Sequence, residues 1–190
     1  MNKLKIVTLF CWLSTLFSLT AMENEKVFFK AVWDGNIEIV TSLLQEGFDP
    51  NQLSSDGKYA LAIAVNLGNV AMAKVLLDNS AQVNVLRGPY QRTVLMRAAY
   101  KGDLKMVELL LTYKADIDAK DRQRRNALMD ASRYGHYNVV EVLLEKDAQV
   151  NEVNSEHCTA LQWAREFGHH DIARLLKAYG AKRNCHFMCC

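Results

Sequence analysis

The last six residues of this 190-residue chain crowd together side chains that could bind a metal or form a disulfide. Cys185, Cys189 and Cys190 stand beside His186 and Met188, and such soft ligands suit Cu(I) or zinc. No known ligand spacing runs through this segment. Three interpretations therefore stay open: a metal site, a disulfide from Cys185 to Cys189 or Cys190 in an oxidising compartment, or a tail with free thiols.

A second concentrated group is the stretch DRQRRNALMDASRYGH, residues 121–136, which carries arginines at 122, 124, 125 and 133. Residues 85–125, which include the first three of these arginines, hold ten basic and five acidic residues. The middle of the chain is therefore a basic band. Clustered arginines occur in nucleic-acid sites, in nuclear localisation signals and at protein interfaces. The choice among these depends on where the chain goes and how it folds.

Enzyme signatures are missing from the sequence. It holds no glycine-rich phosphate loop, no Gly-x-Ser-x-Gly and no His-Glu-x-x-His. We therefore expect a protein without enzymatic activity and without a cofactor.

Residues 1–21, MNKLKIVTLFCWLSTLFSLTA, have the pattern of an export signal peptide. Lys3 and Lys5 form a positive start, an apolar stretch follows, and Ala21 supplies a small residue for cleavage. The apolar stretch is short for a membrane span, which favours cleavage over an uncleaved anchor. The bacterial style of the signal predicts a periplasmic protein, with secretion as the alternative.

Cleavage would remove both lysines and leave 21 basic residues against 21 acidic ones. A net charge of zero and an exported location disfavour nucleic acid as the partner and exclude a nuclear signal. We expect no stable membrane span after cleavage, because cleavage removes the apolar stretch of the signal. The basic band remains, and it predicts a protein partner with an acidic surface.

A period of about 33 residues runs through the remaining chain. Glycines at 35, 68, 102, 135 and 168, leucines at 61, 95, 128 and 161, and Asn51, Asn84, Asp118 and Asn151 all follow it. Apolar blocks such as VVEVLLEKD and ALMDASRYG lie on either side of each glycine with helical spacing. Each unit is therefore expected to be a helix, a glycine break, a second helix and a polar turn.

The unit resembles the ankyrin repeat, whose first helix begins with Thr-Pro-Leu-His. Here the leucine is kept four times and the threonine twice, as in Thr93-Val94-Leu95-Met96, while the proline and histidine are never kept. Gly-His survives at the second-helix start in residues 135–136 and 168–169, and Ala-x-Val-Asn survives in residues 81–84 and 148–151. The resemblance covers about residues 25–184.

The resemblance implies an all-α solenoid of about five helix-turn-helix repeats joined by β-turn fingers. We expect repeats at 22–53, 54–86, 87–120, 121–153 and 154–184, with a cysteine-rich tail at 185–190. A single repeat cannot bury its apolar face, so stacking should create one continuous core containing Leu128, Val140 and Leu143.

Fingertips and first helices line the usual partner-binding face of such stacks, and they place the arginines there. Tyrosine and arginine often carry the binding energy of interfaces. The side chains that we expect to be dispensable for the core are Tyr100, Lys101, Arg122, Arg125, Arg133 and Tyr134. The predicted partner-binding residues are Tyr90, Arg92, Tyr100, Lys101, Arg122, Arg125, Arg133 and Tyr134.

The sequence thus predicts an exported, non-enzymatic module that binds another protein. A periplasmic protective, assembly or toxin-immunity role fits this description. The alternatives are a secreted effector acting on a host protein, and a redox or metal-handling protein that uses the cysteine tail.

Overall fold

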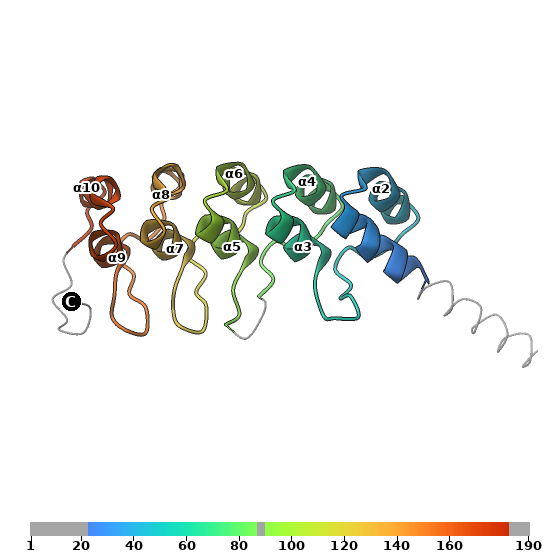
Figure 1. Ribbon diagram of the computed structural model, residues 1–190, viewed down its shortest axis with the longest axis horizontal. Coiled ribbons are helices and arrows are strands. Elements are labelled where there is room, and N and C mark those ends of the chain that lie inside the picture. The colour runs from blue at the N-terminus through green and yellow to red at the C-terminus, as the bar shows by residue number, and fades with distance from the viewer. Residues whose placement is uncertain (1–22, 87–89, 183–190) are drawn as a thin grey trace, which may run out of the picture.

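The computed structural model describes residues 23–86 and 90–182, which form a row of helix pairs (Figure 1). Residues 23–34 are helical and open the row. The helices that follow are α2 (Ile37–Gln45), α3 (Ala60–Leu67), α4 (Val70–Asp78), α5 (Val94–Lys101), α6 (Leu104–Thr112), α7 (Ala127–Arg133), α8 (Tyr137–Glu145), α9 (Ala160–Glu166) and α10 (His170–Ala178). Within this described part, extended pairing occurs only as isolated bridge residues, such as the antiparallel bridge between Leu53 and Tyr59. The predicted all-α solenoid is confirmed.

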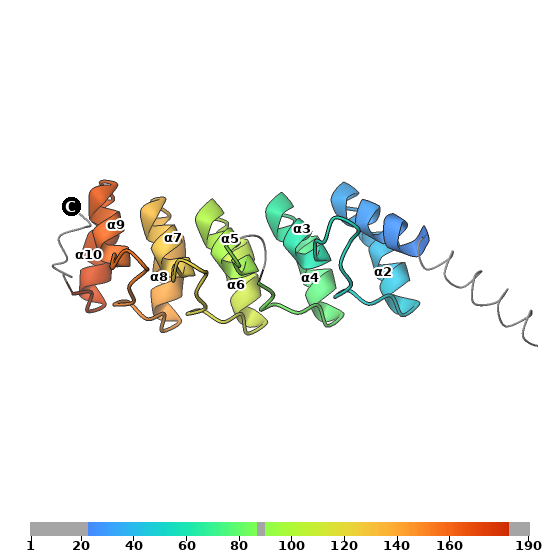
Figure 2. The same cartoon turned by 90° about the horizontal axis from the view of Figure 1, so that it is seen from below.

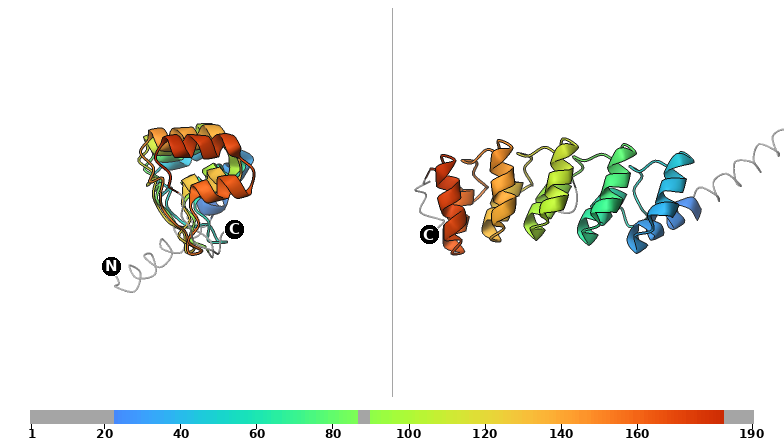
Figure 3. Two further views of the ribbon diagram at one scale, coloured as in Figure 1. Left: turned by 90° about the vertical axis from the view of Figure 1, so that its left-hand side faces the viewer. Right: turned by 90° about the horizontal axis from the view of Figure 1, so that it is seen from above.

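The helices form two layers. The segment 23–34 and helices α3, α5, α7 and α9 lie in one layer, and α2, α4, α6, α8 and α10 lie in the other (Figure 1). Within each layer a helix packs on its counterpart one repeat away, as α5 does on α7 and α6 on α8, and Figure 2 shows the pairs following one another along the row. The fingers extend from the first-helix layer at an angle, as the end-on view in Figure 3 shows. The surface formed by the first helices and the fingers is called the concave face below.

Side-chain caps start the first helices even though the family's proline is missing. Thr93 Oγ1 accepts a hydrogen bond from Met96 N at 3.2 Å, and Asn126 Oδ1 accepts one from Met129 N at 3.0 Å. Thr159 forms a capping box with Gln162 at the start of α9. Each cap satisfies an amide that the helix itself leaves unpaired, so the degenerate motif still fixes where α5, α7 and α9 begin.

The phased glycines end the first helices in a left-handed backbone. Gly102 has φ +71°, and a Cβ added there would lie 2.4 Å from Nδ1 of His136. Gly135 has the same relation to the ring of His169. These positions need glycine both for the backbone angle and for the approach of an imidazole from the next repeat.

The row of Asn51, Asn84, Asp118 and Asn151 joins each repeat to the next. Asn51 Oδ1 accepts a hydrogen bond from Gln82 N at 2.7 Å, and its Nδ2 donates to the carbonyl of Ser80 at 3.0 Å. Asn151 repeats the pattern with Lys182 N and the Gly180 carbonyl. Each side chain satisfies backbone groups just after the second helix of the following repeat, which accounts for the 33-residue period at this position.

One apolar core runs through the described repeats, and the predicted members Leu128, Val140 and Leu143 are confirmed as buried. Leu128 is 1% exposed, and Val140 and Leu143 are fully buried. Because each helix pair shares this core only with its neighbours, the stability of one repeat depends on the packing of the next.

We predict that Leu128→Ala lowers the free energy of unfolding by about 2–5 kcal/mol, because the truncation leaves a cavity at a buried site. Urea denaturation followed by circular dichroism measures the loss. Leu67→Ala is the matched control, because Leu67 ends α3 and is 45% exposed. Equal stabilities for the two variants would contradict the described packing.

Candidate partner-binding surface

A buried polar residue at the base of each of the last two fingers sets the finger's geometry. Asp121 Oδ1 accepts hydrogen bonds from the backbone amides of Gln123 and Arg125 at 2.8 and 2.9 Å. Asn154 holds the next finger in the same way. The fingertip then turns through a left-handed residue at equivalent positions of four repeats: Gly57, Gln91, Arg124 and His157. The sequence reaches this turn without glycine in three of the four fingers.

Two of the predicted binding arginines neutralise buried carboxylates. Arg125 Nε donates to Asp121 Oδ2 at 2.9 Å, and the Asp121 side chain is fully buried. Arg92 pairs with Asp130, whose side chain is 2% exposed. The expectation of dispensability for the core is therefore wrong for Arg125, because its loss would leave a buried charge without its partner. Loss of Arg92 would have the same effect on Asp130.

Exposed apolar side chains line the ends of the first helices in all five repeats. Each lies one or two residues before a phased glycine, and their exposed fractions range from 36% to 47%. The rings of Tyr100 and Tyr134 meet edge to face, with centroids 4.5 Å apart. The row consists of Trp33, Leu67, Tyr100, Tyr134 and Phe167.

Arg133 lies among three aromatic rings of the last two repeats on this surface. Its guanidinium lies 5.1 Å from the ring centroids of both Trp163 and Phe167 and 5.7 Å from that of Tyr134. It forms no ion pair with a carboxylate within residues 23–86 and 90–182. Aromatic faces attract and orient a guanidinium without neutralising it, so Arg133 can still bind an acidic group.

The remaining predicted residues are spread along the same face. Tyr90 is 51% exposed, and its ring centroid lies 5.8 Å from the Arg125 guanidinium. Lys101 Nζ donates to the carbonyl of Asn66 at 2.6 Å. Arg122 N donates to the Tyr90 carbonyl at 2.9 Å and so joins two fingers. The Arg122 side chain is exposed, and among the described residues it forms no hydrogen bond or ion pair with the other predicted binding residues. The ring and cation contacts around Arg133 include Tyr134, which in turn contacts Tyr100.

Histidines of the next repeat hold the carbonyls of two site residues. His136 Nε2 donates to the Tyr100 carbonyl at 2.9 Å, and His169 Nε2 donates to the Arg133 carbonyl at 3.0 Å. His136 and His169 of the Gly-His pairs thus have a structural role between repeats. These bonds also fix the helix ends from which Tyr100 and Arg133 project.

Two hollows open on the concave face and share Tyr90 and Arg92 as a wall. The first, about 340 Å³, lies between α3 and α5 and has Ala62 and Val65 in its lining. The second, about 410 Å³, lies beside the fingers of the last two repeats, with Arg133 and Trp163 in its lining. Sequence reasoning missed Trp163 and Asp130, although the 33-residue period places both at the same position of successive first helices.

The cysteine predictions and the export signal concern residues outside the described range. Segment 1–21 and Cys185, Cys189 and Cys190 lie there, so those expectations stay predictions. Cys158 is buried and disulfide-bonded, a role that the sequence prediction did not give it. In the part of the chain that the structure describes, no three His, Cys, Asp or Glu side chains gather as a metal site, and no helix is long and apolar enough to cross a membrane.

The protein-family model described as ankyrin repeats (3 copies) matches residues 28–121 and again residues 95–186. Together the two matches span most of the chain. The chain belongs to the ankyrin repeat family. Ankyrin repeats are protein–protein interaction modules, and the concave face described above carries the exposed aromatic and arginine side chains suited to that role.

Relatives of this ankyrin repeat protein come from distant organisms. An ankyrin repeat, SAM and basic leucine zipper domain-containing protein of Notamacropus eugenii is 32% identical over 54% of this chain and 22% of its own length. An ankyrin repeat-containing protein of Treponema pallidum is 36% identical over 48% of this chain and 31% of its own. A palmitoyltransferase of Lachancea kluyveri is 33% identical over 46% of this chain and 12% of its own. The chain thus spans under a third of each relative, and the shared feature is the repeat.

Asp130 should make stability depend on pH. Burial raises the pKa of Asp130 to about 6 from its ordinary 3.8, although the nearby Arg92 and Arg125 oppose the shift; Asp121 adds to it. Between about pH 4 and 6 the folded protein therefore holds a proton that the unfolded chain has lost. The free energy of unfolding should rise as pH falls through 6, by up to about 2–3 kcal/mol from this group.

Urea denaturation at pH 7 and pH 5 tests this dependence, with Asp130→Asn as the reference. The asparagine cannot titrate, so the wild-type protein should gain stability relative to the variant on acidification. Other carboxylates act on both proteins alike and cancel in the comparison. A difference between the two proteins that stays constant with pH would overturn the prediction.

Two arginines of one finger should differ in their contribution to stability. Arg125→Ala removes the partner of the fully buried Asp121 and should cost about 2–3 kcal/mol. Arg122→Ala changes an exposed side chain and should stay within about 0.5 kcal/mol. Thermal and urea denaturation of both variants provide the comparison, and equal losses would show that the Asp121–Arg125 pair is not a structural contact.

Proposed function

We propose that this ankyrin repeat protein is a non-enzymatic module that binds a partner protein through its concave face. The observation that carries the proposal is the row of five exposed apolar side chains with Arg133, unpaired with any described carboxylate, beside its last two members, Tyr134 and Phe167. Large rings and arginine are the side chains that most often supply interface energy. A row spanning all five repeats suits an extended contact with another protein better than a small ligand.

The partner's contact surface is acidic in this proposal. Arg133 is free of carboxylate partners among the described residues, while Arg92 and Arg125 are held in place by Asp130 and Asp121. Complementary charge speeds association and selects against wrong partners more than it adds affinity. The basic band of residues 85–125 supports the same choice.

The proposed location is an exported compartment, most simply a periplasm, and it rests on the signal-like residues 1–21. In that compartment a concave binding face fits a protective, assembly or toxin-immunity protein that covers part of another protein. If the chain is secreted onward, the same face would bind a host protein. The location decides between these roles, and the binding chemistry is common to all of them.

Site-specific photo-crosslinking in the native cells tests which face binds. A photoreactive phenylalanine analogue replaces Tyr134, which is 43% exposed on the concave face, or Tyr179, which is 44% exposed at the end of α10 in the other layer. We expect a discrete crosslinked protein from position 134 and none, or a weaker one, from position 179. Mass spectrometry then identifies the partner.

Titration of the identified partner tests the side chains. Arg133→Ala with Tyr134→Ala should weaken binding by about tenfold or more, because either residue can be an interface hot spot. Arg174→Ala is the control, since Arg174 is exposed on α10 in the other layer. Full affinity of the double variant would place the interface elsewhere. A loss caused by arginine alone, with strong salt dependence and nucleic acid as the crosslinked species, would instead indicate a nucleic-acid function.

A further inference from the structure

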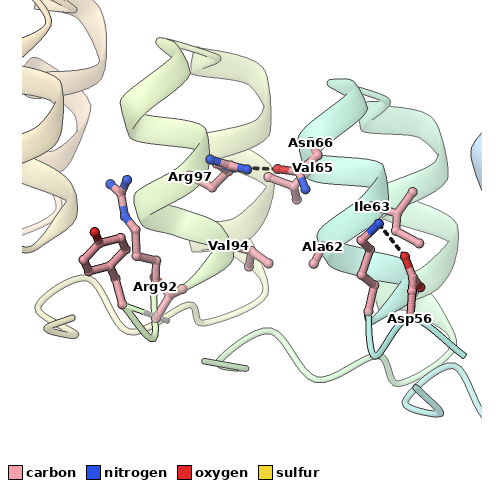
Figure 4. Close-up of a pocket in the computed structure, with 11 residues that line it drawn as sticks. Asp56, Ala62, Ile63, Val65, Asn66, Arg92, Val94 and Arg97 are labelled. Carbon is pink, nitrogen blue, oxygen red and sulfur yellow. Dashed lines mark hydrogen bonds and ion pairs between the residues drawn. The ribbon is translucent and has the colours of Figure 1, made fainter. Parts of the chain in front are cut away.

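The hollow between α3 and α5 is lined mainly by apolar groups. Its volume of about 340 Å³ lies at the lower end of the range for ligand sites. Figure 4 shows Ala62 and Val65 on the side of α3 toward Val94 of α5, with charged side chains around them, and Ile63 also lines the hollow. This apolar hollow with a charged rim is called the α3–α5 slot below.

The slot is open because the side chains at two positions, 62 and 97, leave it unfilled. The residue after the phased leucine is Ala62 in this repeat, whereas the next two repeats have Met96 and Met129 there, each 1% exposed. The residue one place further on is Arg97 in α5, and it turns toward Asn66, with its Nε donating to Asn66 Oδ1 at 2.5 Å. At the matching positions of the later repeats, Asp130 and Trp163 are buried against the fingers.

The rim of the slot carries more positive than negative charge. Lys58 is paired with Asp56 and Arg92 with Asp130, while Arg97 has no ion pair among the residues that the structure describes. Tyr90 adds an exposed ring on the side shared with the second hollow. The slot therefore combines an apolar floor with a cationic, aromatic edge.

We infer that the α3–α5 slot anchors one apolar side chain of an acidic segment of the partner protein. This inference rests on the proposed function and adds the chemistry of the segment: a leucine-sized or aromatic residue enters the slot, and carboxylates beside it meet Arg97 and Arg92. An apolar side chain gains free energy by leaving water and packing on Ala62, which is partly exposed, above Val65 and Val94, which are 1% and 4% exposed. The carboxylates give the orientation, because a guanidinium binds them in a defined plane.

Nuclear magnetic resonance with defined peptides tests the slot without the natural partner. The probes are acetylated, amidated pentapeptides: Asp-Glu-Leu-Asp-Glu, the same peptide with alanine in place of leucine, and Lys-Lys-Leu-Lys-Lys. The methyl signals of Ile63, Val65 and Val94 report on the slot. We expect saturable shifts with the first peptide, about tenfold weaker binding with the second, and none with the third.

A slot-filling variant provides the matched test. Ala62→Leu places extra apolar volume in the slot and should abolish the methyl shifts, while circular dichroism and thermal stability stay unchanged or improve. Ala178→Leu makes the same change at an exposed position of α10 and should bind like the wild-type protein. Equal shifts from the leucine and alanine peptides, or unchanged binding by Ala62→Leu, would overturn the inference.

The outcomes also separate this inference from the proposed function. Crosslinking at position 134 without methyl shifts at the α3–α5 slot would support binding by the concave face and would contradict the apolar anchor. Absence of both would remove both proposals. A slot that binds the basic peptide as well as the acidic one would show a non-selective apolar hollow, which also contradicts the inference.

Discussion

Contact between successive repeats is the interaction on which the rest of this structure depends. A single helix pair leaves one apolar face uncovered, and only the neighbouring pair can bury it. The asparagine row, with Asn51 and Asn151 as clear cases, sets the register by bonding backbone groups of the following repeat. His136 and His169 do the same on the first-helix side, reaching back to the preceding repeat. The spacing of the concave-face residues follows from these bonds.

The binding surface is built from groups that the stack already fixes. His169 holds the carbonyl of Arg133, and the buried Asp130 and Asp121 hold the guanidinium groups of Arg92 and Arg125. Ordering long side chains on association costs free energy, and side chains that are held before binding avoid part of that cost. In the proposed interface, the structural ion pairs would hold Arg92 and Arg125 in fixed orientations beside Arg133, which has no carboxylate partner among the described residues.

The sequence predicted the solenoid because its signals are periodic, and each has a physical cause seen in the structure: Gly102 ends a helix against His136, and Leu128 fills the core. It also placed Tyr100 and Tyr134 on one face. Pairings across repeats were harder to predict. The contact of Arg92 with Asp130 joins residues 38 positions apart and depends on finger geometry, which no local pattern encodes.

The irregular positions of the repeat are therefore the informative ones for function. Where the period is kept, as at the asparagines and glycines, the residue stabilises the stack of repeats. Where it is broken, a surface feature appears: Ala62 replaces a methionine-sized residue and leaves the α3–α5 slot open, and Arg97 turns away to Asn66. Stacking requires the same contacts in every repeat, whereas specific binding of one partner requires a surface that differs from those of other proteins. Departures that leave a hollow open beside Ala62 and Arg97 without a carboxylate among the described residues therefore support the proposed recognition of a partner.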